Sequence, residues 1–283
     1  MKCVKNIMVR DFITVNTDET LQRAARHMTD NKIDCLPVME KERVQGIITF
    51  ADLWSGIGNG KHMVGEIITH PVITIPTFAS IFEAKELMDM HRLEKLLVVD
   101  DGRLVGLVSK PDLHFEIGKN VDELTGFFKK EYILCIGTKL LLAEQEFCIA
   151  FIDINNFGYI DKAYGHHIGD EILKNFAAKL EENKPEGAIL CRYGGDEFVL
   201  VLPFSMEKSM LFVDDLLKNA SKMCCIGDIK ITATAGLAIY NPHDIETLTH
   251  KSNDDIILNL INNASLASSK VKKSRHRLEI FKG

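Results

Sequence analysis

The sequence contains no apolar run that approaches the roughly 20 residues that a helix needs to cross a bilayer. Its N-terminus also lacks the charged and then apolar layout of a secretory signal peptide. No low-complexity stretch interrupts the chain, in which 46% of the residues are hydrophobic and 26% are charged. These absences predict a globular protein of the cytoplasm without a membrane partner.

Cysteine is present, but not in a spacing that binds metal. The seven cysteines are an odd number without a CxxC pair, so we expect reduced cysteines that pack in the core and no zinc site. The adjacent His166 and His167 have no third ligand nearby in the sequence, and structural roles are expected for them. Basic residues are not in surplus either, because 34 Lys and Arg face 40 Asp and Glu. The net charge of −6 predicts no general attraction to nucleic acid polymers.

What the sequence does contain is an internal repeat. An offset of 60 positions superimposes Gly46 on Gly106 and Asp52 on Asp112 without a gap. Each copy is too small to bury its apolar face alone, so the two copies should pack together, each in the order strand, helix, strand, strand, helix. The 283 residues leave room for another domain of ordinary size. The predicted boundaries are 1–59 and 60–118 for the two copies and 119–283 for a second domain.

Both copies carry a hydroxyl residue after a glycine and an apolar strand, with an aspartate three positions later: Thr49 and Asp52, then Ser109 and Asp112. This pattern resembles a tandem CBS domain pair, the Bateman module that commonly binds adenine nucleotides. The resemblance implies that the hydroxyl contacts phosphate or ribose and that the aspartate accepts from the ribose hydroxyls. A hydroxyl before an acid also caps a helix, and many CBS pairs are only dimerisation scaffolds, so these alternatives stay open. The implied ligand is AMP, ADP or ATP, and the implied binding residues are Thr14, Thr49, Asp52, Thr74, Ser109 and Asp112.

The second predicted domain carries the string RYGGDEF at residues 192–198, in which two acids follow paired glycines. The apolar runs 188–191 and 198–202 predict two strands, and both glycines are expected to take positive φ in a tight turn. The two acids, Asp196 and Glu197, therefore lie at a hairpin tip. Taken alone, such a string is most often a turn with a solvated acidic rim.

Three further segments accompany this string in a fixed order: DELTG at 122–126, FIDI at 151–154, and a segment at 164–170 that contains Gly165, Gly169 and Asp170. Together they resemble GGDEF domains, the diguanylate cyclases that join two GTP molecules into cyclic di-GMP. The fold class implied is α/β (α+β), a ferredoxin-like palm whose mixed or antiparallel central sheet is flanked by helices. The apolar segments predict strands at 147–152, 188–191, 198–202 and 229–240, helices at 170–181 and 206–223, and a final helix and strand that ends near 281.

The resemblance implies an active site built on three acids, Asp153, Asp196 and Glu197. Together with the backbone carbonyl of Ile154 they are expected to hold Mg²⁺ or Mn²⁺, since such cations prefer oxygen ligands. Because each domain holds one GTP, the resemblance also implies a homodimer in which two domains face each other. The implied substrate contacts are Asn156, Phe157, Asp161, Asp170, Gly194, Gly195, Lys270 and Arg275.

The sequence departs from the family pattern near the substrate. Asn155, Gly158 and Asp161 stand where a second acid, a lysine and an asparagine are usual. An ionised aspartate only accepts hydrogen bonds, so Asp161 is expected to weaken GTP binding or to shift the base preference. Asp170 matches the position that contacts guanine, although it also directly precedes a predicted helix and is a candidate N-cap.

The C-terminal helix motif departs as well. One extra residue separates Lys270 from Arg275, and the basic cluster that also includes Lys272 is equally typical of a solvated face. Pro185 and Ala188 occupy the positions of an inhibitory RxxD motif, so product inhibition through that site is not expected.

The leading prediction is therefore a Mg²⁺-dependent diguanylate cyclase whose activity is modulated by an adenine nucleotide bound to the CBS pair. One alternative is a GGDEF domain that holds GTP without turnover and acts as a receptor or signalling module. Another keeps the chemistry but makes a mixed or adenine-containing cyclic dinucleotide.

Overall fold

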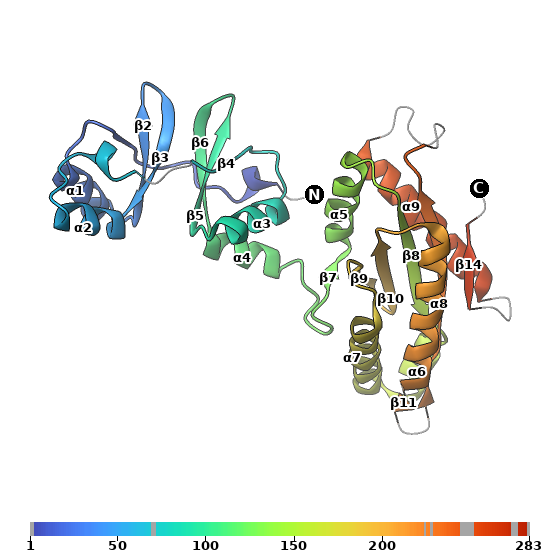
Figure 1. The fold of residues 1–283 in the computed structure, drawn as a ribbon. Coiled ribbons are helices and arrows are strands. Elements are labelled where there is room, and N and C mark those ends of the chain that lie inside the picture. The colour runs from blue at the N-terminus through green and yellow to red at the C-terminus, as the bar shows by residue number, and fades with distance from the viewer. Residues whose placement is uncertain are drawn as a thin grey trace. The chain divides into compact units, whose positions relative to one another are not determined.

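The computed structural model describes residues 3–68, 72–223, 225–226, 229–243, 252–272 and 277–281. The chain divides into two compact units, Met1–Gly118 and Lys119–Gly283, called unit 1 and unit 2 below (Figure 1). None of the helices in these described ranges has both the length and the apolar composition that a bilayer span requires. Cys224 and Arg275 lie outside the described residues.

Unit 1 contains the same arrangement twice. In each copy a short strand pairs in parallel with the first strand of an antiparallel hairpin, giving the sheets β1-β2-β3 and β4-β5-β6. The elements follow the predicted order of strand, helix, strand, strand, helix. Their bounds are β1 Val15–Asn16, α1 Leu21–Asn31, β2 Cys35–Glu40, β3 Arg43–Thr49, α2 Phe50–Gly58, β4 Thr74–Ile75, α3 Ile81–His91, β5 Lys95–Asp100, β6 Arg103–Ser109 and α4 Lys110–Gly118, with 3-10 turns at Val4–Asn6 and Val64–Glu66.

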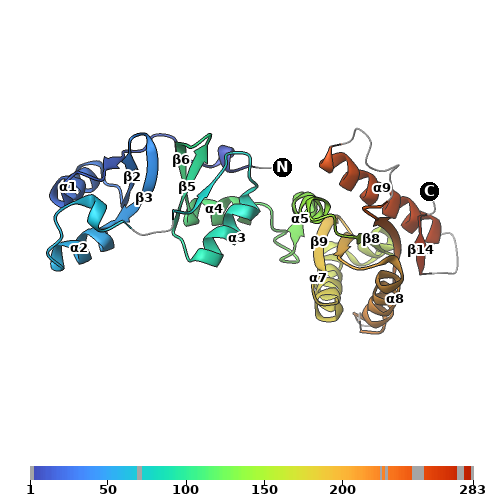
Figure 2. The same ribbon diagram turned by 45° about the horizontal axis from the view of Figure 1, so that its top comes forward.

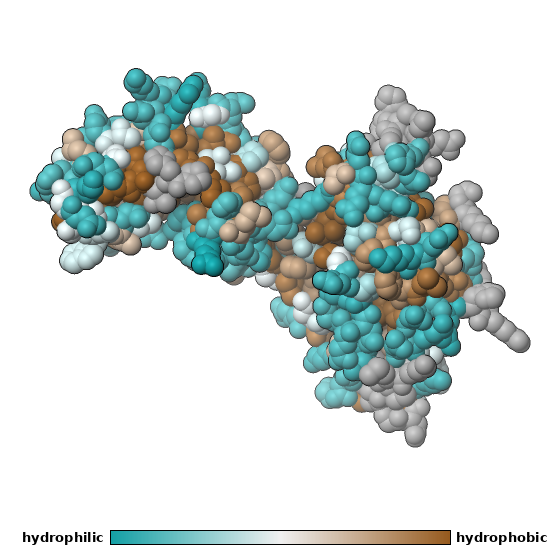
Figure 3. Space-filling view, viewed as in Figure 1, coloured by the Kyte–Doolittle hydropathy of each residue, from teal (hydrophilic) through white to brown (hydrophobic). Residues whose placement is uncertain are grey.

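Equivalent local signals start and end the first helix of each copy. The side chains of Thr20 and Ser80 cap α1 and α3 by accepting a backbone N–H three residues later. Both helices end at a residue with left-handed backbone, Lys32 and Arg92, which closes the last turn. Hydrophobic side chains gather over the middle of unit 1, where the strands of the two copies lie (Figure 3).

Unit 2 is built on a mixed sheet whose six described strands follow the order β14-β13-β8-β10-β9-β7. The edge strands are parallel to their neighbours: β7 pairs with β9, and β14 pairs with β13. The four central strands pair antiparallel with one another. These four strands with α7 and α8 form the β-α-β-β-α-β order of ferredoxin-like folds, so the predicted fold class is confirmed. The bounds are β7 Phe128–Lys129, α5 Lys130–Leu142, β8 Phe147–Ile154, α6 Phe157–Tyr164, α7 His166–Asn183, β9 Ile189–Gly194, β10 Glu197–Leu202, α8 Met206–Met223, β11 Cys225–Ile226, β12 Ile229–Lys230, β13 Ala233–Tyr240, α9 Asn253–Val271 and β14 Leu278–Ile280.

Helices cover both faces of this sheet. In Figure 2, α5 and α9 lie on one side of the strands and α7 and α8 on the other. Alternate residues of β8 therefore enter different cores: Ile152 packs with Phe176 of α7, whereas Phe151 packs with Ile257 of α9. The same alternation puts Asp153, near the end of β8, on the α9 side of the sheet.

Some predicted boundaries in unit 2 are wrong. The helix predicted from residue 170 begins at His166, directly after Gly165, whose φ of 86° ends α6. The strand predicted over 229–240 is divided into β12 and β13. Helices α5 and α6 are absent from the sequence prediction.

Candidate functional site

The RYGGDEF segment forms the predicted hairpin between β9 and β10. Gly194 is the last paired residue of β9, and Gly195 alone has a positive φ, of 49°. The expectation that both glycines take positive φ is therefore wrong, because one such residue is enough to turn the chain here. A side chain added at either glycine would meet no heavy atom within 4 Å, so open space surrounds the tip.

Strand register brings the predicted acids to this hairpin. Asp153 is paired with Glu197 on β10 and with Thr234 on β13. Opposite residues in antiparallel strands have Cβ atoms about 4.5–5.5 Å apart. The N–H of Ile154 donates to the carbonyl oxygen of Asp196 at 3.3 Å, which fixes the turn against the end of β8. Asp153, Asp196 and Glu197, called the acidic corner below, therefore share one end of the sheet.

The acidic corner has more negative than positive charge. Burial, followed by the charge of Asp153, raises the pKa values of Asp196 and Glu197 above their ordinary range. Opposing this, the ammonium of Lys272, directly after α9, lies 2.6 Å from Asp153 Oδ1. Among the described residues, three carboxylates thus share a corner with one lysine.

The donor atoms at this corner suit a divalent cation. Asp153 Oδ1 is buried, and no described N–H or O–H donates a well-directed hydrogen bond to it. The Lys272 ammonium therefore offsets the charge of this oxygen without satisfying it as a hydrogen-bond acceptor. Carboxylate oxygens are the ligands that Mg²⁺ and Mn²⁺ prefer. Within the described ranges, however, no three or more His, Cys, Asp or Glu side chains are drawn together as a metal-binding group. The residues fit such a cation in kind, while an ammonium lies against their central carboxylate.

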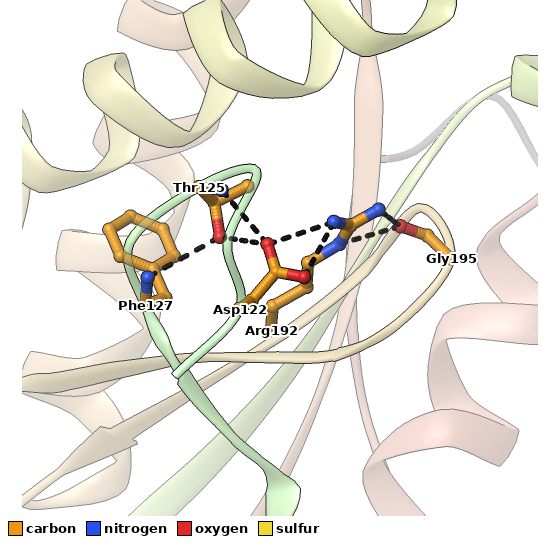
Figure 4. A network of polar contacts seen from close by, with 5 residues as sticks. All are labelled: Asp122, Thr125, Phe127, Arg192 and Gly195. Atoms are coloured by element: carbon orange, nitrogen blue, oxygen red, sulfur yellow. Dashed lines mark hydrogen bonds and ion pairs between the residues drawn. The ribbon is translucent and has the colours of Figure 1, made fainter. Parts of the chain in front are cut away.

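A second polar network holds the other side of the hairpin (Figure 4). Arg192 Nη1 donates to both carboxylate oxygens of Asp122 at 2.9 Å, and its Nε and Nη2 donate to the Gly195 carbonyl at 3.0 and 2.6 Å. Thr125 adds two bonds to Asp122, from its N–H at 2.9 Å and its hydroxyl at 2.7 Å. Although burial alone would raise the pKa of Asp122, these bonds hold it below its ordinary value. Arg192 thereby ties the DELTG loop to the glycine turn. Both motifs were identified from the sequence, but the link between them was not predicted.

The turn after β8 leads into helix α6. Asn156 has a φ of 58°, and helix α6 begins directly after it. The N–H groups of Phe157 and Gly158, in the first turn of α6, have no acceptor among the described residues, and such groups attract anions. The Asn155 amide instead donates to Thr232 Oγ1 at 3.0 Å, so it fastens this turn to the chain before β13.

The predicted base contacts, Asp161 and Asp170, lie on α6 and α7. Asp161 Oδ2 is 2.7 Å from Nδ1 of His166. A Cβ on Gly169 would come within 2.3 Å of Asp161 Oδ1, so the glycine makes room for this carboxylate. Asp170 lies inside α7 and is exposed. The alternative of an N-cap at Asp170 is therefore wrong, and its guanine contact stays a prediction.

Of the two basic residues among the predicted substrate contacts, Lys270 lies in the described chain and Arg275 does not. The Lys270 ammonium is 5.8 Å from the ring centroid of Phe281. Lys272, two residues later, is the lysine that reaches the acidic corner. The sequence spacing of the basic cluster does not show which of these two lysines contacts the acidic corner.

A pocket of about 410 Å³ opens between the two copies of unit 1. Of the six predicted regulatory residues, Ser109 and Asp112 line it. An ion pair at its wall joins Asp34 of the first copy to Lys95 of the second at 3.1 Å. The lining residues are Val9, Asp11, Phe12, Ile13, Asn31, Ile33, Asp34, Cys35, Lys95, Leu107, Ser109 and Asp112.

The predicted cap interactions are present in both copies. Thr49 Oγ1 accepts from the Asp52 N–H at 3.4 Å, and the Thr49 N–H donates to the Asp52 carboxylate at 2.8 Å, which makes a capping box for α2. The Thr49 hydroxyl also donates to this carboxylate, at 2.7 Å. Ser109 likewise accepts from the Asp112 N–H at 3.2 Å and donates to the Asp112 carboxylate. Thr14 and Thr74 are exposed and do not line the pocket.

Comparisons with known proteins identify both units. The family described as "Diguanylate cyclase, GGDEF domain" matches residues 119–264, and the CBS domain family matches residues 4–53 and 64–119. An inosine-5'-monophosphate dehydrogenase of Korarchaeum cryptofilum is 33% identical over 116 residues, which cover 41% of this chain and 24% of that protein. The bifunctional diguanylate cyclase/cyclic di-GMP phosphodiesterase MucR of Pseudomonas aeruginosa is 32% identical over 107 residues, 37% of this chain and 16% of MucR. The chain therefore spans only a minor part of these relatives.

A solved structure resembles unit 2 in fold. The GGDEF domain of DgcB from Caulobacter crescentus, determined in complex with c-di-GMP, has a TM-score of 0.50 and 18% sequence identity. The match covers 58% of this chain and 96% of that one. At this identity the likeness concerns the fold alone.

Proposed function

The chain belongs to the GGDEF domain family of diguanylate cyclases and carries a CBS domain pair, and from this premise we propose that it joins two GTP molecules into cyclic di-GMP with release of pyrophosphate. The observation that carries the proposal is the acidic corner, where strand register brings Asp153 and Glu197 opposite each other beside Asp196. Such an excess of carboxylates costs stability, and a site that binds a cation and triphosphate accounts for it.

Each of the two bonds to be formed joins the 3′-oxygen of one GTP to the α-phosphorus of the other, while the bond to the pyrophosphate breaks. Bound Mg²⁺ or Mn²⁺ would neutralise the α-phosphate and acidify the hydroxyl. Asp153, Asp196, Glu197 and the carbonyl of Ile154 would hold that cation. One of the two hairpin acids would also accept the proton that the 3′-hydroxyl loses.

Other parts of unit 2 would position the nucleotide. The free N–H groups of Phe157 and Gly158 would donate to the terminal phosphates. Gly194 and Gly195 leave the hairpin backbone open to close approach. Because each domain would hold one GTP, the reaction needs two copies of the chain, and we propose a homodimer.

The pocket of unit 1 would bind the regulatory nucleotide, with Asp112 on the ribose hydroxyls and Ser109 beside it. Three carboxylates, of Asp11, Asp34 and Asp112, face one ammonium, of Lys95. This balance disfavours a long polyphosphate, so we expect AMP to bind more tightly than ADP or ATP.

A second candidate function is a receptor that binds GTP without turnover. It is favoured by the ion pair between Lys272 and Asp153, which uses the central acid of the corner. The Asp161–His166 pair likewise gives the base site different chemistry from the family's asparagine.

An activity assay separates these functions. The purified chain is incubated with GTP and Mg²⁺, with and without AMP or ATP, and products are identified by chromatography and mass. We expect cyclic di-GMP from the native chain and from Asp214→Ala, a surface control on α8, but none from Asp196→Ala. Tight GTP binding without product after prolonged incubation would support the receptor. A different cyclic dinucleotide would show that the base preference has shifted.

The regulatory part is tested by binding. Asp112→Ala is expected to weaken AMP binding at least tenfold while the cyclase rate without AMP stays unchanged. Equal AMP affinity in both proteins, measured by calorimetry, would exclude this pocket.

A further inference from the structure

Lys272 makes a contact with the acidic corner that none of the sequence motifs requires. Its ammonium lies 2.6 Å from Asp153 Oδ1, while the side chain stays 42% exposed. The carboxylate it meets is 13% exposed and belongs to the strand in the middle of the corner. A long, half-exposed side chain on a buried acid can leave that acid without disturbing the core.

The oxygen that Lys272 meets is also the one best suited to a cation. Among the described residues, Asp153 Oδ1 receives no directed hydrogen bond, so nothing besides the ammonium occupies it. An ammonium and a divalent cation cannot both lie against this atom, because their like charges would repel at short range. Asp196 and Glu197, the neighbouring acids, have no ion pair of their own in the described chain.

We propose that Lys272 is an internal counter-ion that occupies the cation position on Asp153 in the free protein and has to leave it when a divalent cation binds. This inference rests on the proposed function, since it concerns the same acids. Lys272 stabilises the empty corner by offsetting carboxylate repulsion, and it lowers the affinity for the cation by the same contact. In the complex with nucleotide, the released ammonium would face the triphosphate, which gives it a new anionic partner.

The test measures Mn²⁺ binding to the full chain without nucleotide, by the paramagnetic resonance signal of free Mn²⁺. Lys272→Met keeps the aliphatic stem and removes the charge. We expect it to bind Mn²⁺ about tenfold more tightly than the native chain. In EDTA the same variant should have a lower Tm, which added Mn²⁺ restores. Asp153→Asn should abolish binding in both backgrounds.

The control is Lys218→Met on α8. Lys218 pairs with Asp214 and is 43% exposed, a close match to Lys272, but it lies away from the corner. Its removal should leave Mn²⁺ affinity unchanged. If Lys272→Met binds Mn²⁺ no more tightly than the native chain while Asp153→Asn abolishes binding, the counter-ion role is wrong and the metal site stands. If no variant binds Mn²⁺, even with a non-hydrolysable GTP analogue, both the counter-ion and the proposed cyclase are wrong.

Discussion

The two sides of the glycine hairpin treat their carboxylates in opposite ways. On one side Asp122 has a full partner in Arg192 and two further donors from Thr125, and its pKa is lowered despite burial. On the other side three acids share one lysine of the described chain, and the pKa values of Asp196 and Glu197 are raised, first by burial. A few residues of one turn therefore separate a charge-balanced site from a charge-deficient one.

The two kinds of acid contribute differently to the stability of the fold. A carboxylate whose two oxygens accept from one arginine nitrogen stabilises the structure at neutral pH. Acids that raise one another's pKa values destabilise it, and such groups are concentrated at functional sites. The balanced side fixes the hairpin through the carbonyl of Gly195, so that the deficient side is held in place.

The largest expected effect comes from neutralising an acid of the deficient side. Glu197→Gln should reduce cyclic di-GMP formation by about three orders of magnitude, because the side chain proposed as cation ligand and proton acceptor loses its charge. In EDTA the same change should raise the free energy of unfolding, since one repelling charge has gone. Product assays and urea unfolding by circular dichroism measure the two halves. If Glu197→Gln is active and less stable than the native chain, the acids of this side hold the fold and do not take part in the reaction.

The next effect comes from breaking the balanced side. Arg192→Met removes the cationic partner of the Asp122 carboxylate. The site is mostly buried, because the side chains of Arg192 and Asp122 are only 13% and 19% exposed. We expect a loss of about 3 kcal/mol in the unfolding free energy of unit 2. Hydrogen exchange of the β9 and β10 peptides assigns the loss to the hairpin. Lys218→Met, which breaks an exposed pair, should cost much less than Arg192→Met.

The pH dependence of stability should separate the two sides by sign. Asp122 has a lowered pKa when folded, so the loss caused by Asp122→Asn persists above about pH 3.9 and disappears only as the pH falls through the folded value. Glu197 has a raised pKa when folded, so the gain caused by Glu197→Gln shrinks as the pH falls through that raised value and is gone near pH 4.3.

Urea unfolding in EDTA between pH 3 and pH 7 measures both differences against the native chain. Above about pH 4.3 the Asp122→Asn difference should stay constant, while the Glu197→Gln difference should grow with pH. Parallel curves for the two variants would mean that the hairpin does not separate two kinds of acid site.

The order of helices and strands could be predicted from the sequence more completely than the residues at which helices begin. The repeat, the hairpin and the β-α-β-β-α-β order follow from apolar periodicity and glycine placement. The helices that were missed or misplaced, α5, α6 and α7, have no side-chain hydrogen bond at their N-caps. Without a capping residue the local sequence does not mark where a helix begins.

The contacts that give the site its character are long-range, and the sequence analysis did not find them. Arg192 and Asp122 are 70 positions apart, and Lys272 reaches Asp153 from the far end of α9. The acids could be named because adjacent residues and short motifs carry them. Their counter-ions could not, since charge pairing across a sheet depends on strand register and helix packing.

The smallest effect is expected from the Thr125 hydroxyl, a second donor to Asp122 on the balanced side. Thr125→Val removes the hydroxyl that donates to Asp122 at 2.7 Å but keeps the backbone N–H bond and the arginine. Because other donors remain, the loss should be about 1 kcal/mol, less than that of Arg192→Met. Thr125→Ser keeps the hydroxyl and should retain most of the stability, which urea unfolding measures. If Thr125→Ser costs more than Thr125→Val, the methyl group and not the hydroxyl holds the loop, and the charge of Asp122 is balanced by Arg192 and the backbone N–H without the threonine hydroxyl.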